Sequence, residues 1–171
     1  MPKGEAELQA RLDELGIAHE TVEHAPVFTV EESQDLRGQL DGAHVKNMFL
    51  RDKKKRLWLV TVLEDRVVDL KALKKRIGAQ GSLSFGDAEL LMAVVGVTPG
   101  SVTPFGVIND ADKRLSVILD SGIFAEQTVN AHPLRNDKTT RIASADLIRF
   151  MEAEGYRPEI IDFGQPLVEA E

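Results

Sequence analysis

The chain opens with leucines at helical spacing. Leu8, Leu12 and Leu15 fall on one side of a helical repeat, and Gly16 follows where a helix can close with a left-handed residue. The pattern predicts an amphipathic helix over residues 5–15 whose leucines face a core.

The next two predicted elements are short. A strand is predicted over residues 19–22. Thr29 and Glu32 then have the T-x-x-E spacing of a capping box, in which each side chain bonds to the backbone amide of the other residue. A helix that begins there must end near Gly38.

Two β-rich runs follow and predict an antiparallel hairpin. They cover residues 45–51 and 56–63, and the polar residues Lys53–Lys55 between them would form its tip.

Three further helices are marked by a capping residue and a closing glycine. Residues 97–104 hold two prolines and a glycine and predict a shaped loop. Strand character resumes at residues 105–108 and 115–119, and residues 160–163 predict an edge strand. The cap and glycine pairs are Asp69 with Gly78, Asp87 with Gly96, and Ser144 with Gly155.

These elements predict an α+β fold: a single domain over residues 1–171, with a mixed, largely antiparallel sheet and peripheral helices. Strands outnumber the β-α-β alternations, and several have hairpin-length connections, which a doubly wound parallel sheet does not use. A chain of 171 residues with 43% apolar content suits one core of this kind.

Composition narrows the chemistry. The absence of cysteine excludes disulfides, thiolate nucleophiles and cysteine zinc sites, and it suits the reducing cytoplasm. No apolar stretch reaches the length that spans a bilayer. The four histidines lie far apart, and there is no Walker loop, dinucleotide fingerprint or G-x-S-x-G elbow, so neither a metal nor a cofactor is predicted.

The formal net charge of −7 argues against nucleic-acid binding by the whole surface, so any such contact must be local. One basic cluster is Lys53–Arg56. The other, Lys71, Lys74 and Lys75 with Arg76, has the spacing of one helical face. Both clusters also fit an ordinary solvated surface.

Three features could carry chemistry, and the first is a lysine within an apolar strand. Alternation places Lys46 on one face and Val45, Asn47 and Phe49 on the other. Lys46 is then either a snorkelling lysine at a sheet edge or a cation beside a substrate phosphate or ribose.

The second feature is the Gly100–Pro104 loop and the third is His132. A glycine allows close backbone approach and a proline stiffens the exit, so the loop amides can point at one oxyanion; a plain surface turn has the same composition. A lone histidine is either a structural hydrogen-bonding residue or a substrate contact. The loop residues are Gly100, Ser101, Val102, Thr103 and Pro104.

Several short motifs, taken in order, resemble one family. They are Lys46-Asn47 at the head of a strand, Asp69-Leu70-Lys71 before a helix, Leu83-Ser84-Phe85, Gly100-x-x-x-Pro104 with Phe105, Leu119-Asp120, and His132-Pro133-Leu134. Their order is similar to that of the YbaK and prolyl-tRNA synthetase editing-domain family, and within it to the free-standing alanyl-tRNA(Pro) deacylases of the ProXp-ala type. The resemblance runs from about Leu8 to about Phe163.

This resemblance implies an ester hydrolase that removes alanine from mischarged tRNA(Pro). Amino acids whose side chains differ by a small apolar group are discriminated by only about 1–3 kcal/mol in one binding pocket. A second, size-limited pocket multiplies this selectivity. The implied partner is the acceptor end of tRNA(Pro), with prolyl-tRNA synthetase as a second candidate partner. Neither DNA, a membrane, a cofactor nor a metal is implied.

The resemblance also implies roles for individual residues. Lys46 would lie beside the terminal adenosine, and the amides of Gly100–Thr103 would bind the oxyanion that forms when water, positioned by the substrate's ribose hydroxyl, attacks the ester. Asn47 and His132 would orient the substrate or the loop. The remaining predicted contacts are Val27, Phe28, Val30 and Met48 around the amino acid, with core packing as the alternative, and Lys71, Lys74 and Lys75 at the acceptor stem.

Three alternatives stay open. The chain could deacylate cysteinyl-tRNA(Pro) or another small aminoacyl-tRNA. It could be a non-catalytic module that binds tRNA or a synthetase, or a structural protein in which substitution of Lys46 changes little besides stability.

Overall fold

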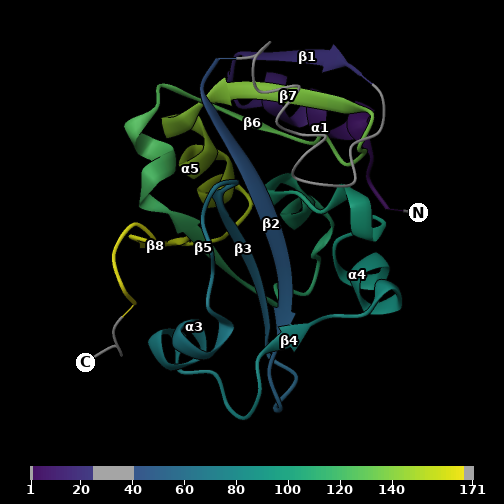
Figure 1. The fold of residues 1–171 in the computed structure, drawn as a ribbon. Coiled ribbons are helices and arrows are strands. Elements are labelled where there is room, and N and C mark those ends of the chain that lie inside the picture. Colours follow the sequence, from purple (N-terminus) through teal and green to yellow (C-terminus); the bar gives the residue numbers. More distant parts are fainter. Residues whose placement is uncertain (1, 25–40, 168–171) are drawn as a thin grey trace.

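A sheet of eight strands forms the centre of the computed structural model, which describes residues 2–24 and 41–167 (Figure 1). The strands lie in the order β1-β7-β6-β2-β3-β5-β8, with β4 beside β2. The capping box and short helix predicted at residues 29–38 fall outside the described residues. The strands are β1 (His19–Glu23), β2 (Ala43–Arg51), β3 (Leu57–Leu63), β4 (Ser84–Phe85), β5 (Leu115–Asp120), β6 (Thr128–Ala131), β7 (Lys138–Ala143) and β8 (Glu159–Ile161).

The sheet mixes both strand directions. Among the described residues, β1–β7, β2–β3, β2–β4 and β6–β7 pair antiparallel, whereas β2–β6, β3–β5 and β5–β8 pair parallel. The predicted hairpin is confirmed as β2 and β3, in register from Val45 with Leu63 to Arg51 with Leu57. With helices packed around this sheet, the α+β prediction is confirmed.

The helices begin and end where local chemistry places them. Asp69 caps α3 by accepting from the amides of Lys71 and Ala72, and Gly78 closes it in the left-handed conformation. Asp87 caps α4. None of the described helices is long and apolar enough to cross a membrane. The described α-helices are α1 (Glu5–Glu14), α3 (Leu70–Ile77), α4 (Ala88–Val94) and α5 (Ser144–Ala153).

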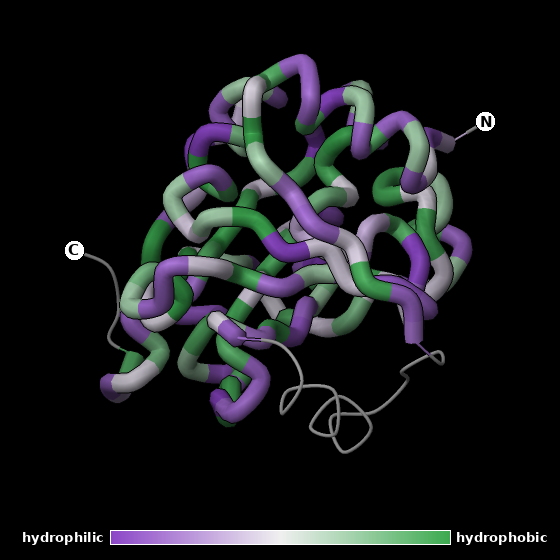
Figure 2. Tube along the Cα trace, turned by 90° about the horizontal axis from the view of Figure 1, so that it is seen from above, coloured by the Kyte–Doolittle hydropathy of each residue, from purple (hydrophilic) through white to green (hydrophobic). Residues whose placement is uncertain are grey.

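Each face of the sheet has an apolar core. The larger core includes Leu59 of β3 and Phe150 of α5, and α1 and α4 also contribute to it. The smaller core joins Leu50 and Val60 to Leu73 of α3, which lies against the far half of the β2–β3 hairpin (Figure 1). In Figure 2 apolar stretches, in green, cross the middle of the molecule. Burial of one such leucine stabilises the fold by about 1.5–3 kcal/mol.

Residues 105–108 form part of a 3₁₀ helix, η2 (Pro104–Asn109), so the strand predicted there is wrong. Pro104 stands at the first helical position, which suits its fixed φ, and the Thr103 hydroxyl accepts from the Phe105 amide at 3.3 Å. A short, fully buried apolar run does not distinguish a strand from a helix.

One further prediction needs correction in the last third of the chain, and two strands there were missed. Ser144 is the first residue of α5 and not its cap, which is Ala143. Strands β6 and β7, which were not predicted, pair with each other and join β2 and β1, two strands distant in sequence. The predicted edge strand is present as β8, which begins at Glu159 and ends at Ile161.

Candidate active site

Residues of β2 divide between the two faces of the sheet around Lys46. Val45 and Phe49 contact the larger core, whereas Met48 and Leu50 belong to the smaller one. Because side chains alternate along a strand, Lys46 lies on the face of the smaller core, as predicted.

The Lys46 ammonium is held by a backbone carbonyl. Its Nζ donates to the carbonyl oxygen of Arg66. The Arg66 guanidinium in turn bonds to Asp120, with Nε 2.9 Å from Oδ2, and this hydrogen bond raises the pKa of Arg66. Asp120 is fully buried and also accepts from the amides of Leu63 and Gly122. A buried carboxylate therefore fixes the carbonyl that positions Lys46.

Polar side chains gather on this face where β6 joins β2. The two strands run parallel and pair His44 with Asn130, so these side chains point to the same face. The pairing ends there: Lys46 follows His44 on β2 and His132 follows Asn130 just beyond β6, each by two residues. On β7, Thr139 shares the face. We refer to Lys46, His44, Asn130, His132, Thr139 and His24 as the polar face.

His132 is a neutral, oriented ring at the end of β6. Its Nδ1 lies 3.0 Å from the carbonyl oxygen of Lys138; because a carbonyl only accepts, Nδ1 carries the proton and Nε2 keeps its lone pair. Burial lowers the pKa of His132, and the nearby His24 acts in the same direction. The His24 ring centroid is 6.3 Å away, and its Nε2 bonds to the Thr139 hydroxyl at 2.8 Å. His132 is thus suited to accept a hydrogen bond from a water or hydroxyl.

The Gly100–Pro104 loop is tied directly to His132. Thr103 is fully buried, and its hydroxyl donates to the carbonyl oxygen of His132 at 2.6 Å. The same hydroxyl caps η2, so one side chain fixes both the loop and the 3₁₀ helix that follows it. The loop therefore contacts the backbone of His132, while its residue Val102 and the neighbouring Phe105 pack with the larger core.

The amides of this loop are not equivalent. Within η1 (Pro99–Ser101), the Ser101 amide donates to the Thr98 carbonyl at 2.9 Å, so it is engaged inside the loop. The Gly100 amide lies in the first turn, where helix amides have no partner within the helix. The Ser101 amide is therefore engaged, and among the described residues no hydrogen bond is formed by the amides of Gly100, Val102 and Thr103.

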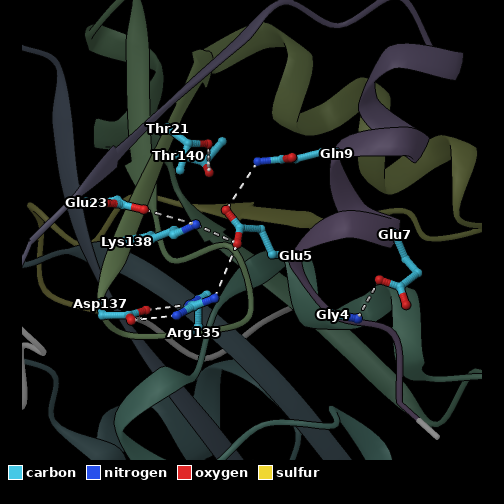
Figure 3. A network of polar contacts seen from close by, with 10 residues as sticks. All are labelled: Gly4, Glu5, Glu7, Gln9, Thr21, Glu23, Arg135, Asp137, Lys138 and Thr140. Carbon is cyan, nitrogen blue, oxygen red and sulfur yellow. Dashed lines mark hydrogen bonds and ion pairs between the residues drawn. The ribbon is translucent and has the colours of Figure 1, made fainter.

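A network of ion pairs braces the segment after His132 against α1 (Figure 3). Lys138 Nζ lies 2.9 Å from Oε1 of Glu5, a residue of the first turn of α1. The Arg135 guanidinium lies 2.6 Å from Oδ2 of Asp137 and 3.5 Å from the same Glu5 oxygen. These contacts fix Lys138, whose carbonyl orients the His132 ring.

Other predicted site residues are placed elsewhere. Asn47 lies on the opposite face from Lys46, and its Oδ1 accepts from the Thr61 hydroxyl at 2.6 Å. Met48 is buried in the smaller core, on the Lys46 face. The remaining predicted pocket residues, Val27, Phe28 and Val30, lie outside the described residues.

The basic cluster of α3 borders a surface cavity of about 510 Å³. Lys71, Lys74 and Lys75 line it together with Ser82 and neighbouring leucines. Since Leu73 packs α3 onto the smaller core, this cavity and the polar face lie on the same side of the sheet.

The second basic cluster, Lys53–Arg56, is fixed beside the first. The buried Asp52 carboxylate accepts from the Arg56 guanidinium at 2.9 Å and from the Gln80 amide at 3.0 Å. Burial alone would raise the pKa of Asp52, but these hydrogen bonds outweigh it and hold the pKa below its usual range. The hairpin tip is thereby joined to the segment that follows α3.

Several residues of the polar face were not predicted as site residues. Asn130 donates to the Ala43 carbonyl at 3.1 Å, and its buried Oδ1 has no hydrogen-bond partner among the described residues. A polar residue in a short apolar strand is the available signal, but its surroundings depend on the pairing of β2 with β6. Over residues 2–24 and 41–167, no three His, Asp or Glu side chains converge as a metal site requires.

Comparison with known sequences gives one family. The model of the aminoacyl-tRNA editing domain matches residues 24–150. A mouse protein named prolyl-tRNA synthetase associated domain-containing protein 1 is 40% identical over 162 residues, covering 92% of this chain and 95% of the relative. Prolyl-tRNA editing protein ProX of Acetoanaerobium sticklandii is 37% identical over 147 residues, covering 85% and 89%.

Solved structures share the fold. The crystal structure of hypothetical protein APE2540 matches with a TM-score of 0.73 at 16% identity and covers 91% of this chain and 97% of that one. A candidate trans-editing enzyme for prolyl tRNA synthetase matches with a TM-score of 0.71 at 20% identity, covering 95% and 97%. At such identities the likeness concerns the fold alone.

Proposed function

Because this chain belongs to the aminoacyl-tRNA editing domain family, we propose that it hydrolyses mischarged alanyl-tRNA(Pro) and releases alanine and free tRNA. Relatives named for prolyl-tRNA editing and for association with prolyl-tRNA synthetase support the tRNA class. A reaction on tRNA also places the protein, in this proposal, in the cytoplasm, with prolyl-tRNA synthetase as a candidate partner.

One observation carries the proposal: the 2.6 Å hydrogen bond between Thr103 and the His132 carbonyl. It joins the Gly100–Pro104 loop to the end of β6, a strand that pairs with β2 at His44 and Asn130, two residues before Lys46 and His132. In this proposal the Lys46 cation, the His132 lone pair and a loop amide must reach one ester at this end of β6.

In the proposed reaction these groups position water and stabilise charge. Lys46 has three donors, one of which is bound to the Arg66 carbonyl, and the others hold the ribose-phosphate end of the terminal adenosine. The Gly100 amide donates to the ester carbonyl oxygen as it becomes an oxyanion. His132 Nε2 accepts from the attacking water or from the neighbouring ribose hydroxyl.

The bond changes are those of ester hydrolysis. The water oxygen bonds to the carbonyl carbon, the bond from that carbon to the ribose oxygen breaks, and a proton of the water passes to the ribose oxygen. The substrate's second ribose hydroxyl relays this proton, so the protein supplies orientation and charge stabilisation rather than a nucleophile. In this proposal Val27, Phe28 and Val30 limit the size of the amino-acid pocket, while Lys71, Lys74 and Lys75 contact the acceptor stem.

The test is a substrate panel. Purified protein is incubated with alanyl-, cysteinyl- and prolyl-tRNA(Pro), and the loss of each charged tRNA is followed beside a Lys46→Ala control. Rapid loss of alanyl-tRNA(Pro) alone is expected. Preferred loss of cysteinyl-tRNA(Pro) would replace the alanine assignment, and stability of all three esters would leave a tRNA-binding module without hydrolysis.

A further inference from the structure

A second cavity, of about 440 Å³, opens at the edge of the sheet beside β5. β8 pairs with β5 only from Ile118 onward, so the earlier part of β5 forms one wall of this groove. Residues 155–157, after α5, form another wall, and Trp58 of β3 lies at its base. Three cationic side chains line it: Arg56, Lys113 and Arg157.

Two of these cations are held in place by the groove's own walls. Lys113 Nζ lies 4.9 Å from the centroid of the Tyr156 ring and donates to the carbonyl of Glu154. The Tyr156 hydroxyl donates to Asp110 Oδ2 at 2.6 Å, which anchors the ring. Arg56 lies 5.4 Å from the centroid of Trp58. Lys113 and Arg56 are therefore oriented before any ligand arrives.

The groove has an excess of positive charge in a chain of net charge −7. Arg56 is balanced by Asp52, and the groove carboxylate Glu159 is already paired with Arg76 at 2.7 Å. Within the described part of the chain, no carboxylate forms an ion pair with Lys113 or Arg157. An anion is therefore the ligand that the groove favours.

The burial of the two aromatic rings indicates that the groove binds phosphates and not nucleotide bases. Trp58 is 5% exposed and Tyr156 is 6% exposed, so neither presents a face on which a base could stack. The groove also lies near the proposed site. Trp58, which lines the groove, pairs with Leu50, and Val62 pairs with Lys46. Trp58 and Val62 are four residues apart on β3, which corresponds to about 13 Å along the strand. An RNA stem bound at Lys46 extends further than this.

We propose that the Arg56–Lys113–Arg157 groove binds backbone phosphates of the same tRNA whose acceptor end enters the polar face, and so acts as a second anchor. This inference rests on the proposed function for the identity of the RNA. It requires that binding energy at the groove depends on charge and hardly on nucleotide sequence.

The first experiment measures uncharged tRNA(Pro) binding by fluorescence anisotropy across a salt series. The variants are Arg157→Gln and the double variant Lys113→Gln/Arg157→Gln, with Arg149→Gln as control because Arg149 is an exposed α5 residue that contacts Leu15. Each lost groove cation should reduce the slope of log affinity against log salt by about one. The control should keep the wild-type slope. Slopes equal to wild type in both groove variants would overturn the proposal.

The second experiment separates the groove from the hydrolytic site. The ratio of kcat/KM for full-length aminoacyl-tRNA to that for an aminoacylated CCA trinucleotide should fall about three- to tenfold in Arg157→Glu. An equal loss on both substrates would indicate a structural effect and overturn the inference. If wild-type protein hydrolyses neither substrate, the proposed function fails, while the salt series still decides whether the groove binds RNA. Unchanged tRNA binding with lost binding of a polyglutamate peptide would assign the groove to an acidic protein segment and overturn the proposal.

Discussion

The two halves of β2 present opposite chemistry on the same face of the sheet. In the first half, Lys46 follows His44 on this face, and His44 pairs with Asn130, whose buried Oδ1 has no partner among the described residues. In the second half, Met48 and Leu50 pack into the smaller core beneath α3. A buried polar group without a hydrogen-bond partner costs free energy of folding. The first half of β2 therefore stabilises the fold less than the apolar second half does.

This contrast separates residues that hold the fold from residues that serve the reaction. The second half stabilises the hairpin through buried apolar area, and the first half depends on β6, β7 and the Gly100–Pro104 loop to orient its polar groups. Substitutions in the first half should therefore change kinetics more than stability, and substitutions in the second half should do the reverse.

The largest expected effect on activity is that of Lys46→Ala. Removing the cation should lower kcat/KM for alanyl-tRNA(Pro) by about 10²–10³-fold, the range seen when one group that stabilises transition-state charge is lost. Thermal unfolding should change little, because Lys46 is half-buried and its ammonium is bound by one carbonyl among the described residues. Single-turnover deacylation together with a melting curve tests both parts, and a variant with wild-type turnover would remove Lys46 from the site.

In the second half of the strand, Leu50→Ala should mainly destabilise the fold. Leu50 is 0% exposed, and truncating a buried leucine costs about 2–5 kcal/mol of unfolding free energy. Urea unfolding gives that difference, and kcat/KM per folded molecule should stay near the wild-type value. A severe kinetic loss with unchanged stability would erase the distinction between the two halves.

Thr103→Val tests how the loop is fastened to the polar face. The substitution keeps the shape of the side chain but removes the 2.6 Å hydrogen bond to the His132 carbonyl, leaving a buried acceptor without this donor. We expect a loss of about 1–3 kcal/mol in unfolding free energy and a drop in kcat larger than the change in KM. Thr140→Val serves as a matched control, since Thr140 is also fully buried but its hydroxyl bonds to that of Thr21.

Elements set by neighbouring residues could be predicted from the sequence, whereas the pairing of strands distant in sequence could not. The α3 boundaries were predictable because Asp69 and Gly78 satisfy the ends of their own helix. The strand predicted at residues 105–108 failed because a short apolar run fits either state. Lys46 stood out as a charge in an apolar strand, whereas the pairing of β2 with β6 beside it joins segments far apart in the chain.

The smallest expected effect is a pH dependence that distinguishes the polar half of β2 from the apolar half. Burial lowers the pKa of His132 below the ordinary value of 6.5. Just below pH 6.5, His132 is therefore protonated more often in the unfolded chain than in the folded chain. The stability contributed by neutral His132 is therefore complete above pH 6.5 and is lost as the pH falls toward the folded pKa. Deacylation should decline over the same acid range because Nε2 must keep its lone pair. Rate profiles from pH 5 to 8 for wild type and His132→Gln test this: the variant should lack the acid decline, and an identical decline in both proteins would assign it to another group.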